Sequence, residues 1–308
     1  MIISASRRTD IPAFYSKWMI NRFRAGYCCV PNPFNRNQVS YISLDANDLD
    51  AVIFWTRNPK PLMKYLPELD DLGINYYFQF SILDYPRELD PKSPSLNAAQ
   101  RTFKELSDLI GADKVIWRYD PIVFTKSTDT KYHIDKFTTL ASELHNHTNR
   151  AVISIVDDYR KARGRMNSLP TPKFELSTEG SIETLAPNLA KTLSSICATH
   201  DLEIESCSET IDLSTVGVPA GKCIDDELIN RLFNNTLKRR KDKNQRDQCG
   251  CNESRDIGMY DSCVFGCAYC YATQSFEKAA SNLSEHDSNS PSLLGNCSCE
   301  PPKQKTLF

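Results

Sequence analysis

The chain has 308 residues, of which 40% are hydrophobic and 25% are charged, and its formal net charge is −2. This length can bury the core of one large α/β domain with an appendage. The balanced charge argues against a dedicated nucleic-acid binder, and no apolar run reaches the length of a membrane span. Because the apolar stretch at the amino end is too short for a signal peptide, we expect a cytoplasmic protein.

Short runs rich in β-branched and aromatic residues predict buried parallel strands, and segments with helical spacing of apolar residues lie between them. The predicted strands are 2–5, 51–55, 76–81, 115–118, 151–156 and 202–206. The proline-containing stretch 27–44 interrupts this alternation and predicts an inserted loop or hairpin. Repeated strand–helix units favour an α/β fold, namely a partial (β/α)6 TIM-like barrel, with a doubly wound open sheet as the alternative.

The pattern changes after the sixth strand. We predict a barrel core over 1–210, a cysteine-rich metal-cluster module over 211–280, and a disordered tail over 281–308, where serine, asparagine and proline dominate. The chain has 12 cysteines, and most of them follow the predicted core. In a chain of this size without an export signal, such a cluster favours metal or redox chemistry over disulfides. We expect simple packing or no defined role for Cys28, Cys29, Cys197, Cys297 and Cys299.

Cys263, Cys267 and Cys270 form a C-x3-C-x2-C arrangement on one short loop. Three thiolates so placed can hold three irons of a 4Fe-4S cluster and leave the fourth iron without a protein ligand. Gly266 would let the loop curl so that the sulfurs converge. Structural zinc, the alternative, requires four closed ligands and is usually assembled from paired knuckles, so the spacing favours an iron–sulfur cluster.

Residues 263–272, Cys-Val-Phe-Gly-Cys-Ala-Tyr-Cys-Tyr-Ala, resemble the cluster loop of radical S-adenosylmethionine (SAM) enzymes. The resemblance implies a partial (β/α)6 barrel, an open iron that binds SAM, and reductive cleavage of SAM to a radical that abstracts hydrogen from a substrate. In that family the cluster loop follows the first strand and a Gly-Gly-Glu segment follows the second. Here the loop follows the sixth predicted strand, and no such segment is present.

The chain to about residue 273 also resembles the family named domain of unknown function 1848. The resemblance lies in four segments, which are 3–12 (Ile-Ser-Ala-Ser-Arg-Arg-Thr-Asp-Ile-Pro), 54–59 (Phe-Trp-Thr-Arg-Asn-Pro), 117–121 (Trp-Arg-Tyr-Asp-Pro) and 256–263 (Asp-Ile-Gly-Met-Tyr-Asp-Ser-Cys). Membership of this family implies no particular activity.

A second set of thiols consists of Cys207, Cys223, Cys249 and Cys251. Four thiolates suffice for a fully ligated second cluster or for tetrahedral zinc. Unligated thiols are the third alternative. Because Cys207 ends the sixth predicted strand, this set is expected at the mouth of the barrel.

Polar residues follow several predicted strands, at the edge where barrels bind ligands. We predict cofactor-binding roles for Arg7, Arg8, Asp10, Arg57, Asn58, Gln79, Arg118 and Asp120. Guanidinium groups bind carboxylate or phosphate, so this mouth suits the carboxylate of SAM or an anionic substrate. The competing interpretation is structural ion pairing of Arg8 with Asp10 and of Arg118 with Asp120. We expect Trp55 and Trp117 to pack in the barrel rather than to stack on a ligand.

The sequence therefore predicts a radical SAM-like iron–sulfur enzyme that carries one or two 4Fe-4S clusters and acts on an unknown, small or anionic substrate. An electron donor such as flavodoxin or ferredoxin would be its partner, and nucleic acid or membrane would not. No catalytic side chain is assigned. The alternatives are a non-catalytic iron–sulfur or zinc protein in electron transfer or metal sensing, and a nucleic-acid lesion enzyme, because the Cys-Ala-Tyr-Cys-Tyr ending also resembles photoproduct lyases.

Overall fold

The computed structural model describes residues 1–157, 160–169 and 181–301. Its centre is a seven-stranded sheet with the order β8-β7-β6-β5-β4-β1-β9, in which every neighbouring pair is parallel. The strands are β1 (Ile2–Ala5), β4 (Ala51–Thr56), β5 (Tyr76–Ser81), β6 (Val115–Ile122), β7 (Arg150–Ile155), β8 (Glu203–Ser206) and β9 (Arg255–Asp256). All six predicted strands are confirmed, and the two-residue β9 was not predicted.

The six longer strands follow one another across the sheet in chain order. A doubly wound sheet reverses its order at a switch point, so that alternative is wrong. Among the described residues no pairing joins β8 to β9. The sheet is thus open, which confirms a parallel α/β fold but not a TIM-like barrel. No described helix is both long and apolar enough to cross a membrane.

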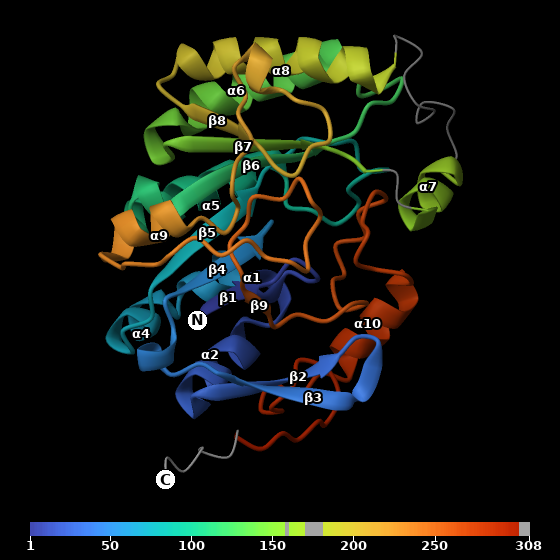
Figure 1. Cartoon of the computed structure of the whole chain (residues 1–308). Helices are drawn as coiled ribbons and strands as arrows, with labels where there is room; N and C mark the ends of the chain where they lie inside the picture. The colour runs from blue at the N-terminus through green and yellow to red at the C-terminus, as the bar shows by residue number, and fades with distance from the viewer. Residues whose placement is uncertain (158–159, 170–180, 302–308) are drawn as a thin grey trace.

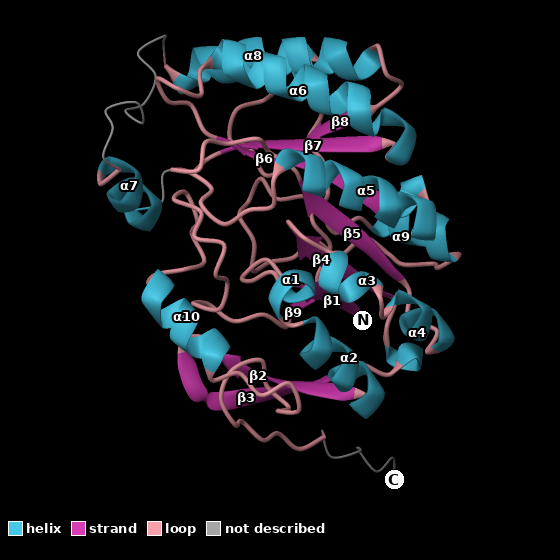
Figure 2. Cartoon of the chain, turned by 180° about the vertical axis from the view of Figure 1, so that it is seen from behind, coloured by secondary structure: helices cyan, strands magenta, loops and turns pink. Residues whose placement is uncertain are grey.

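The sheet is buried on both faces, as its nearly continuous apolar strands require. Most helices cover one face, which Figure 2 shows from their side, and they enclose the large core that contains Trp18, Phe78 and Trp117. The described helices are α1 (Ile11–Phe14), α2 (Ser16–Ala25), α3 (Lys60–Met63), α4 (Leu66–Asp71), α5 (Leu96–Ile110), α6 (Thr130–Leu144), α7 (Arg160–Asn167), α8 (Ile182–Ala198), α9 (Asp226–Phe233) and α10 (Phe276–Ser284).

The opposite face of the sheet is covered by residues that follow β8. Leu228 and Ile229 of α9 pack there with Ile53 and Tyr77 from the sheet, and Figure 1 shows α9 and the orange segment after it in front of the strands. Part of the stretch 211–280, which the sequence predicts to be a cysteine-rich metal-cluster module, thus covers this face of the sheet, and residues 255–256 of the stretch form β9.

The predicted insertion at 27–44 is a hairpin of β2 (Tyr27–Asn32) and β3 (Asn35–Ser43). The chain beyond α10 returns to this region, which Figure 1 shows in red below the hairpin. Trp18 Nε1 donates to the carbonyl of Ser290 at 2.9 Å, and Leu293 is 1% exposed. The disorder expected for 281–301 is therefore not observed, because backbone carbonyls of this polar stretch accept hydrogen bonds from α2. Residues 302–308 lie outside the described part of the chain.

A disulfide joins Cys29 on the hairpin to Cys299 in this returning segment, across 270 residues of sequence. The sequence interpretation gave neither cysteine a partner. Cys28 and Cys197 are fully buried with free thiols, as a packing role requires.

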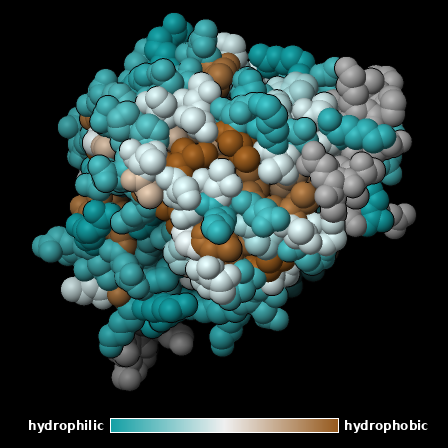
Figure 3. Space-filling model, turned by 90° about the horizontal axis from the view of Figure 1, so that it is seen from above, coloured by the Kyte–Doolittle hydropathy of each residue, from teal (hydrophilic) through white to brown (hydrophobic). Residues whose placement is uncertain are grey.

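Figure 3 shows the molecule from above, where apolar residues gather near the centre of a largely hydrophilic face.

His133 on α6 is a buried histidine that should make stability depend on pH. It is 0% exposed, its Nδ1 lies 2.9 Å from the Tyr119 hydroxyl, and its pKa is lowered to about 4, chiefly by burial. Between pH 6.5 and 4 the unfolded chain therefore binds more protons than the folded protein does. The free energy of unfolding consequently decreases as the pH falls from 6.5 towards 4, and His133 causes no such decrease above pH 6.5. A shift of this size corresponds to roughly 3 kcal/mol.

Urea denaturation at several pH values measures this effect. In His133→Gln, the fall in unfolding free energy between pH 6.5 and 4 should be smaller than in the wild type by an amount of this order. Equal slopes in the two proteins would contradict a neutral, buried His133.

Candidate functional site

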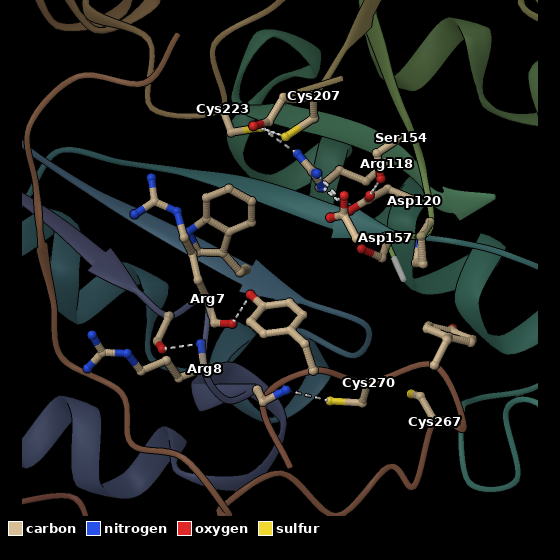
Figure 4. A pocket seen from close by; sticks show the side chains of 18 of the residues that line it. Arg7, Arg8, Arg118, Asp120, Ser154, Asp157, Cys207, Cys223, Cys267 and Cys270 are labelled. Carbon is tan, nitrogen blue, oxygen red and sulfur yellow. Dashed lines mark hydrogen bonds and ion pairs between the residues drawn. The ribbon is translucent and has the colours of Figure 1, made fainter. Parts of the chain in front are cut away.

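A cavity of about 430 Å³ lies at the carboxyl ends of the strands. Both predicted cysteine sets line it, together with six of the eight polar residues predicted to bind a cofactor. The lining residues predicted from sequence are Arg7, Arg8, Asp10, Arg57, Arg118, Asp120, Cys207, Cys223, Cys249, Cys251, Cys263, Cys267 and Cys270. The topology explains this convergence, because parallel strands end at one edge and the segment after β8 crosses that edge. In Figure 4, Cys207 and Cys223 lie on one side of the cavity, and Cys267 and Cys270 lie on the other.

Asn58 and Gln79 are not among the cavity-lining residues. The Asn58 side chain accepts from the Lys60 backbone N–H at 3.3 Å, where α3 begins. Gln79 donates to the carbonyl of Cys223 at 2.9 Å and accepts from Arg118 at 3.2 Å. In this structure Asn58 supports the start of a helix and Gln79 contacts two cavity-lining residues, so neither side chain lines the cavity itself.

Cys263, Cys267 and Cys270 occupy a loop whose curvature depends on Gly266. This glycine has φ of +78°, a left-handed conformation that other residues rarely adopt, as the sequence predicted. Burial raises the pKa of Cys263 to about 12 and that of Cys267 well above its ordinary value. These buried thiols therefore hold their protons at neutral pH, and a bound metal or cluster would have to displace those protons.

An ion pair holds this loop from the sheet side. Arg57, which follows β4, binds both oxygens of Asp90 at 2.7 Å and also donates to Cys267 Sγ at 3.1 Å. The Tyr269 hydroxyl donates to the same carboxylate at 2.9 Å. Asp90 is 3% exposed, and these partners offset the cost of burying its charge. Arg57 thus positions the cysteine loop, a role that its place at a strand end did not reveal.

Arg165 on α7 holds the loop from the other side. Its guanidinium donates to the carbonyls of Ala268 at 3.0 Å and Thr273 at 2.7 Å, and also to the carbonyl of Cys270. One planar donor group thereby fixes the end of the loop at three points. The sequence gave no sign of this role, because Arg165 lies on a short polar helix far from the predicted strand ends.

A family model described as Domain of unknown function (DUF1848) matches residues 2–272. The chain belongs to this family. No curated protein matches the sequence. The residues of this DUF1848 protein that match the family model include all seven cysteines of the cavity, whereas Cys297 and Cys299 lie beyond the match.

The second cysteine set of this DUF1848 protein is a contiguous group of thiols. Cys207 Sγ lies 3.1 Å from Cys223 Sγ, and Cys251 is hydrogen-bonded to both Cys223 and Cys249. Arg118 donates to Cys223 Sγ at 2.8 Å. The hydrogen bond between Cys207 and Cys223 lowers the pKa of Cys207 to about 7. A second hydrogen bond, between Cys251 and Cys223, is the largest cause of the lowered pKa of Cys251.

These thiols contact one another more closely than metal ligands do. Four sulfurs at 2.3 Å from a tetrahedral zinc lie about 3.8 Å apart, so Cys207 and Cys223 would have to separate to admit an ion. Within the described ranges, no group of three or more histidine, cysteine, aspartate or glutamate side chains is arranged to hold a metal ion as it stands. Four thiols are suitable ligands for a thiophilic metal, but Cys207 and Cys223 lie closer together than they would around a bound ion.

Arg118 and Asp120 form the ion pair that the sequence left as an alternative, at 2.6 Å. Asp10 does not pair with Arg8, because its carboxylate accepts from the Thr56 hydroxyl and the Arg57 backbone N–H. Burial raises the pKa of Asp10 to about 7. Of the predicted ligand residues, Arg118 and Asp10 therefore also have structural roles.

Two cavity features were missed by the sequence interpretation. Trp55 lines the cavity between the guanidinium groups of Arg7 and Arg118, which lie 5.4 and 5.0 Å from its ring centroid, so it is not simply a packing residue. Asp256 of β9 accepts from the Ser6 hydroxyl and the Arg7 backbone N–H at 2.8 and 2.9 Å, and thereby shapes the loop after β1. The sequence did contain a signal for this role, because Asp256 begins the segment 256–263, one of the four segments that resemble the family.

Proposed function

We propose that this protein is an iron–sulfur enzyme of the radical SAM type, in which Cys263, Cys267 and Cys270 hold a 4Fe-4S cluster with one iron free of protein ligands. The observation that carries the proposal is the cavity at the carboxyl ends of the strands, which three thiols of one curled loop share with several arginines. When bound and reduced, such a cluster supplies the chemistry of SAM cleavage and hydrogen abstraction. Sequential parallel strands, as in a partial barrel, agree with this proposal.

The chain's own residues would position the reactants. Arg57 and Arg165 hold the loop from opposite sides through the contacts described above. Arg8 is suited to an anionic ligand, because its described contacts are with the Tyr260 ring and the carbonyl of Gly258 rather than with a carboxylate. The cavity of about 430 Å³ is of the size that encloses a small molecule. A one-electron donor of the flavodoxin or ferredoxin type would be the partner.

Formation of 5′-deoxyadenosine tests this proposal. The protein would be reconstituted anaerobically with iron and sulfide, reduced with dithionite, incubated with SAM and assayed by liquid chromatography with mass spectrometry. We expect 5′-deoxyadenosine only when both reductant and cluster are present. Its absence from protein that demonstrably holds the cluster would overturn the radical mechanism and favour the non-catalytic iron–sulfur protein.

A further inference from the structure

Three segments of the chain bring the second cysteine set together, and glycines permit their approach. The loop at Gly221 runs beside β8, where the Gly221 N–H donates to the Ser206 carbonyl at 2.8 Å. A Cβ atom at Gly221 would lie 2.4 Å from the Glu205 carboxylate, and one at Gly250 would lie 3.1 Å from the Gly221 carbonyl oxygen. Larger residues would push these segments apart, so the glycines support close approach of the thiols.

Nitrogen donors already point at these sulfurs. The Ile224 backbone N–H donates to Cys251 Sγ at 3.4 Å, and Arg118 donates to Cys223 Sγ at 2.8 Å. Arg7 is hydrogen-bonded to Cys251 from the loop after β1. Donors of this kind stabilise the thiolates of metal sites.

Further donors around the same thiols are buried and lack an acceptor. Within the described part of the chain, Arg7 Nη2, Trp55 Nε1 and Ser208 Oγ have no hydrogen-bond partner. Ser208 follows Cys207 directly and is 7% exposed, and Trp55 packs against the apolar cluster that contains Cys223 and Cys251. Burying a donor without an acceptor is unfavourable, because the donor loses its hydrogen bonds to water. These donors therefore indicate acceptors that the protein itself does not supply.

We infer that Cys207, Cys223, Cys249 and Cys251 ligate an iron–sulfur cluster, and that its sulfides accept hydrogen bonds from the unpartnered donors on this wall of the cavity. A cluster requires the four sulfurs to separate further than zinc does, and Cys207 and Cys223 now lie 3.1 Å apart. The unpartnered donors nevertheless favour the cluster, because zinc would bring no acceptor atoms of its own, whereas a cluster brings inorganic sulfides. This site does not depend on the SAM chemistry proposed above. Its place on the wall opposite the Cys263 loop gives the cavity two metal centres.

Metal analysis of the variant in which Cys263, Cys267 and Cys270 are all replaced with alanine tests the site alone. After anaerobic reconstitution this variant should retain iron and acid-labile sulfide in roughly equal amounts, as iron–sulfur clusters contain. Adding Cys249→Ser and Cys251→Ser should remove both. Retention of zinc without sulfide would overturn the inference, and so would a folded variant that holds no metal.

The same analysis on an otherwise wild-type background guards against misfolding of the triple variant. Cys249→Ser with Cys251→Ser should lower iron and sulfide per chain but leave the share bound to the Cys263 loop. An unchanged iron content would also overturn the inference. Circular dichroism confirms that each variant is folded. Failure of SAM cleavage would leave these results unaffected, so the two proposals can fail separately.

The role of Arg7 is tested by the midpoint potential of the second cluster. Loss of a positive charge and a hydrogen bond from cluster sulfur makes reduction less favourable, so Arg7→Gln should shift the potential to a more negative value. Arg24→Gln is the control for the loss of one positive charge elsewhere, because Arg24 pairs with Glu68 on the surface and is not among the cavity-lining residues. Equal potentials in the wild type and Arg7→Gln would show that Arg7 does not act on this centre.

Discussion

Replacing Cys263, Cys267 and Cys270 together with alanine should abolish formation of 5′-deoxyadenosine and remove about four irons per chain, the content of one cubane cluster. The expected loss is complete because these thiols are the ligands of the proposed catalytic cluster and line the cavity in which SAM would bind. The measurements are metal and sulfide content after anaerobic reconstitution, and 5′-deoxyadenosine by mass spectrometry.

Cys197→Ala is the matched control for the effect of removing a buried thiol. Cys197 is 0% exposed within the core of the helix-covered face, away from the cavity-lining residues. This variant should keep both the iron content and the SAM cleavage of the wild type. Wild-type amounts of iron in the triple variant would mean that the cluster ligands lie elsewhere.

Asp90→Ala should destabilise the protein by about 3–5 kcal/mol, the cost of breaking a buried ion pair by removing one partner. The side chains of Arg57 and Asp90 are 14% and 3% exposed, and the variant leaves Arg57 buried without its carboxylate. It also removes the acceptor of the Tyr269 hydroxyl. Because both partners hold the cysteine loop, the variant should also retain less iron after reconstitution. Urea denaturation measures the change in stability.

Glu143→Ala provides the comparison for an exposed ion pair. Glu143 pairs with Lys104 at 2.7 Å, but the two side chains are 49% and 35% exposed. Exposed pairs of this kind contribute little to stability, because water screens the two charges. Equal losses of stability in Asp90→Ala and Glu143→Ala would show that the Arg57–Asp90 pair does not anchor the loop.

The strands, and the gathering of the cysteines at one edge of the sheet, could both be predicted from sequence because the strands are parallel and buried. Strands buried on both faces produce continuous apolar runs, such as 51–55 and 76–81, and parallel strands place their carboxyl ends at a common edge. The position of Cys207 at the end of β8 then indicated where the other thiols would gather. β9 escaped prediction, because two residues, Arg255 and Asp256, are too short for any periodicity.

Pairing among charged groups could not be predicted, because it depends on distances that strand order does not fix. Arg57 follows one predicted strand and Arg118 ends another, so the sequence interpretation assigned both the same role. The structure pairs Arg57 with Asp90 on a distant loop and Arg118 with Asp120 two residues away. The segment 285–301 is misleading in another way, since its polar composition suggests disorder, whereas its backbone carbonyls supply acceptors for Trp18 and Arg22.

The position of β9 has a consequence for the order of biosynthesis. β1 is translated well before β9, which is formed by residues 255 and 256, and β1 lies in the sheet between β4 and β9. Until these residues leave the ribosome, one edge of β1 lacks its partner strand and is open to pairing with other chains. The cysteines proposed as cluster ligands are likewise complete only once Cys270 has been translated. Under the proposed function, iron and sulfide would therefore be delivered after the early folding of the nascent chain rather than guide it.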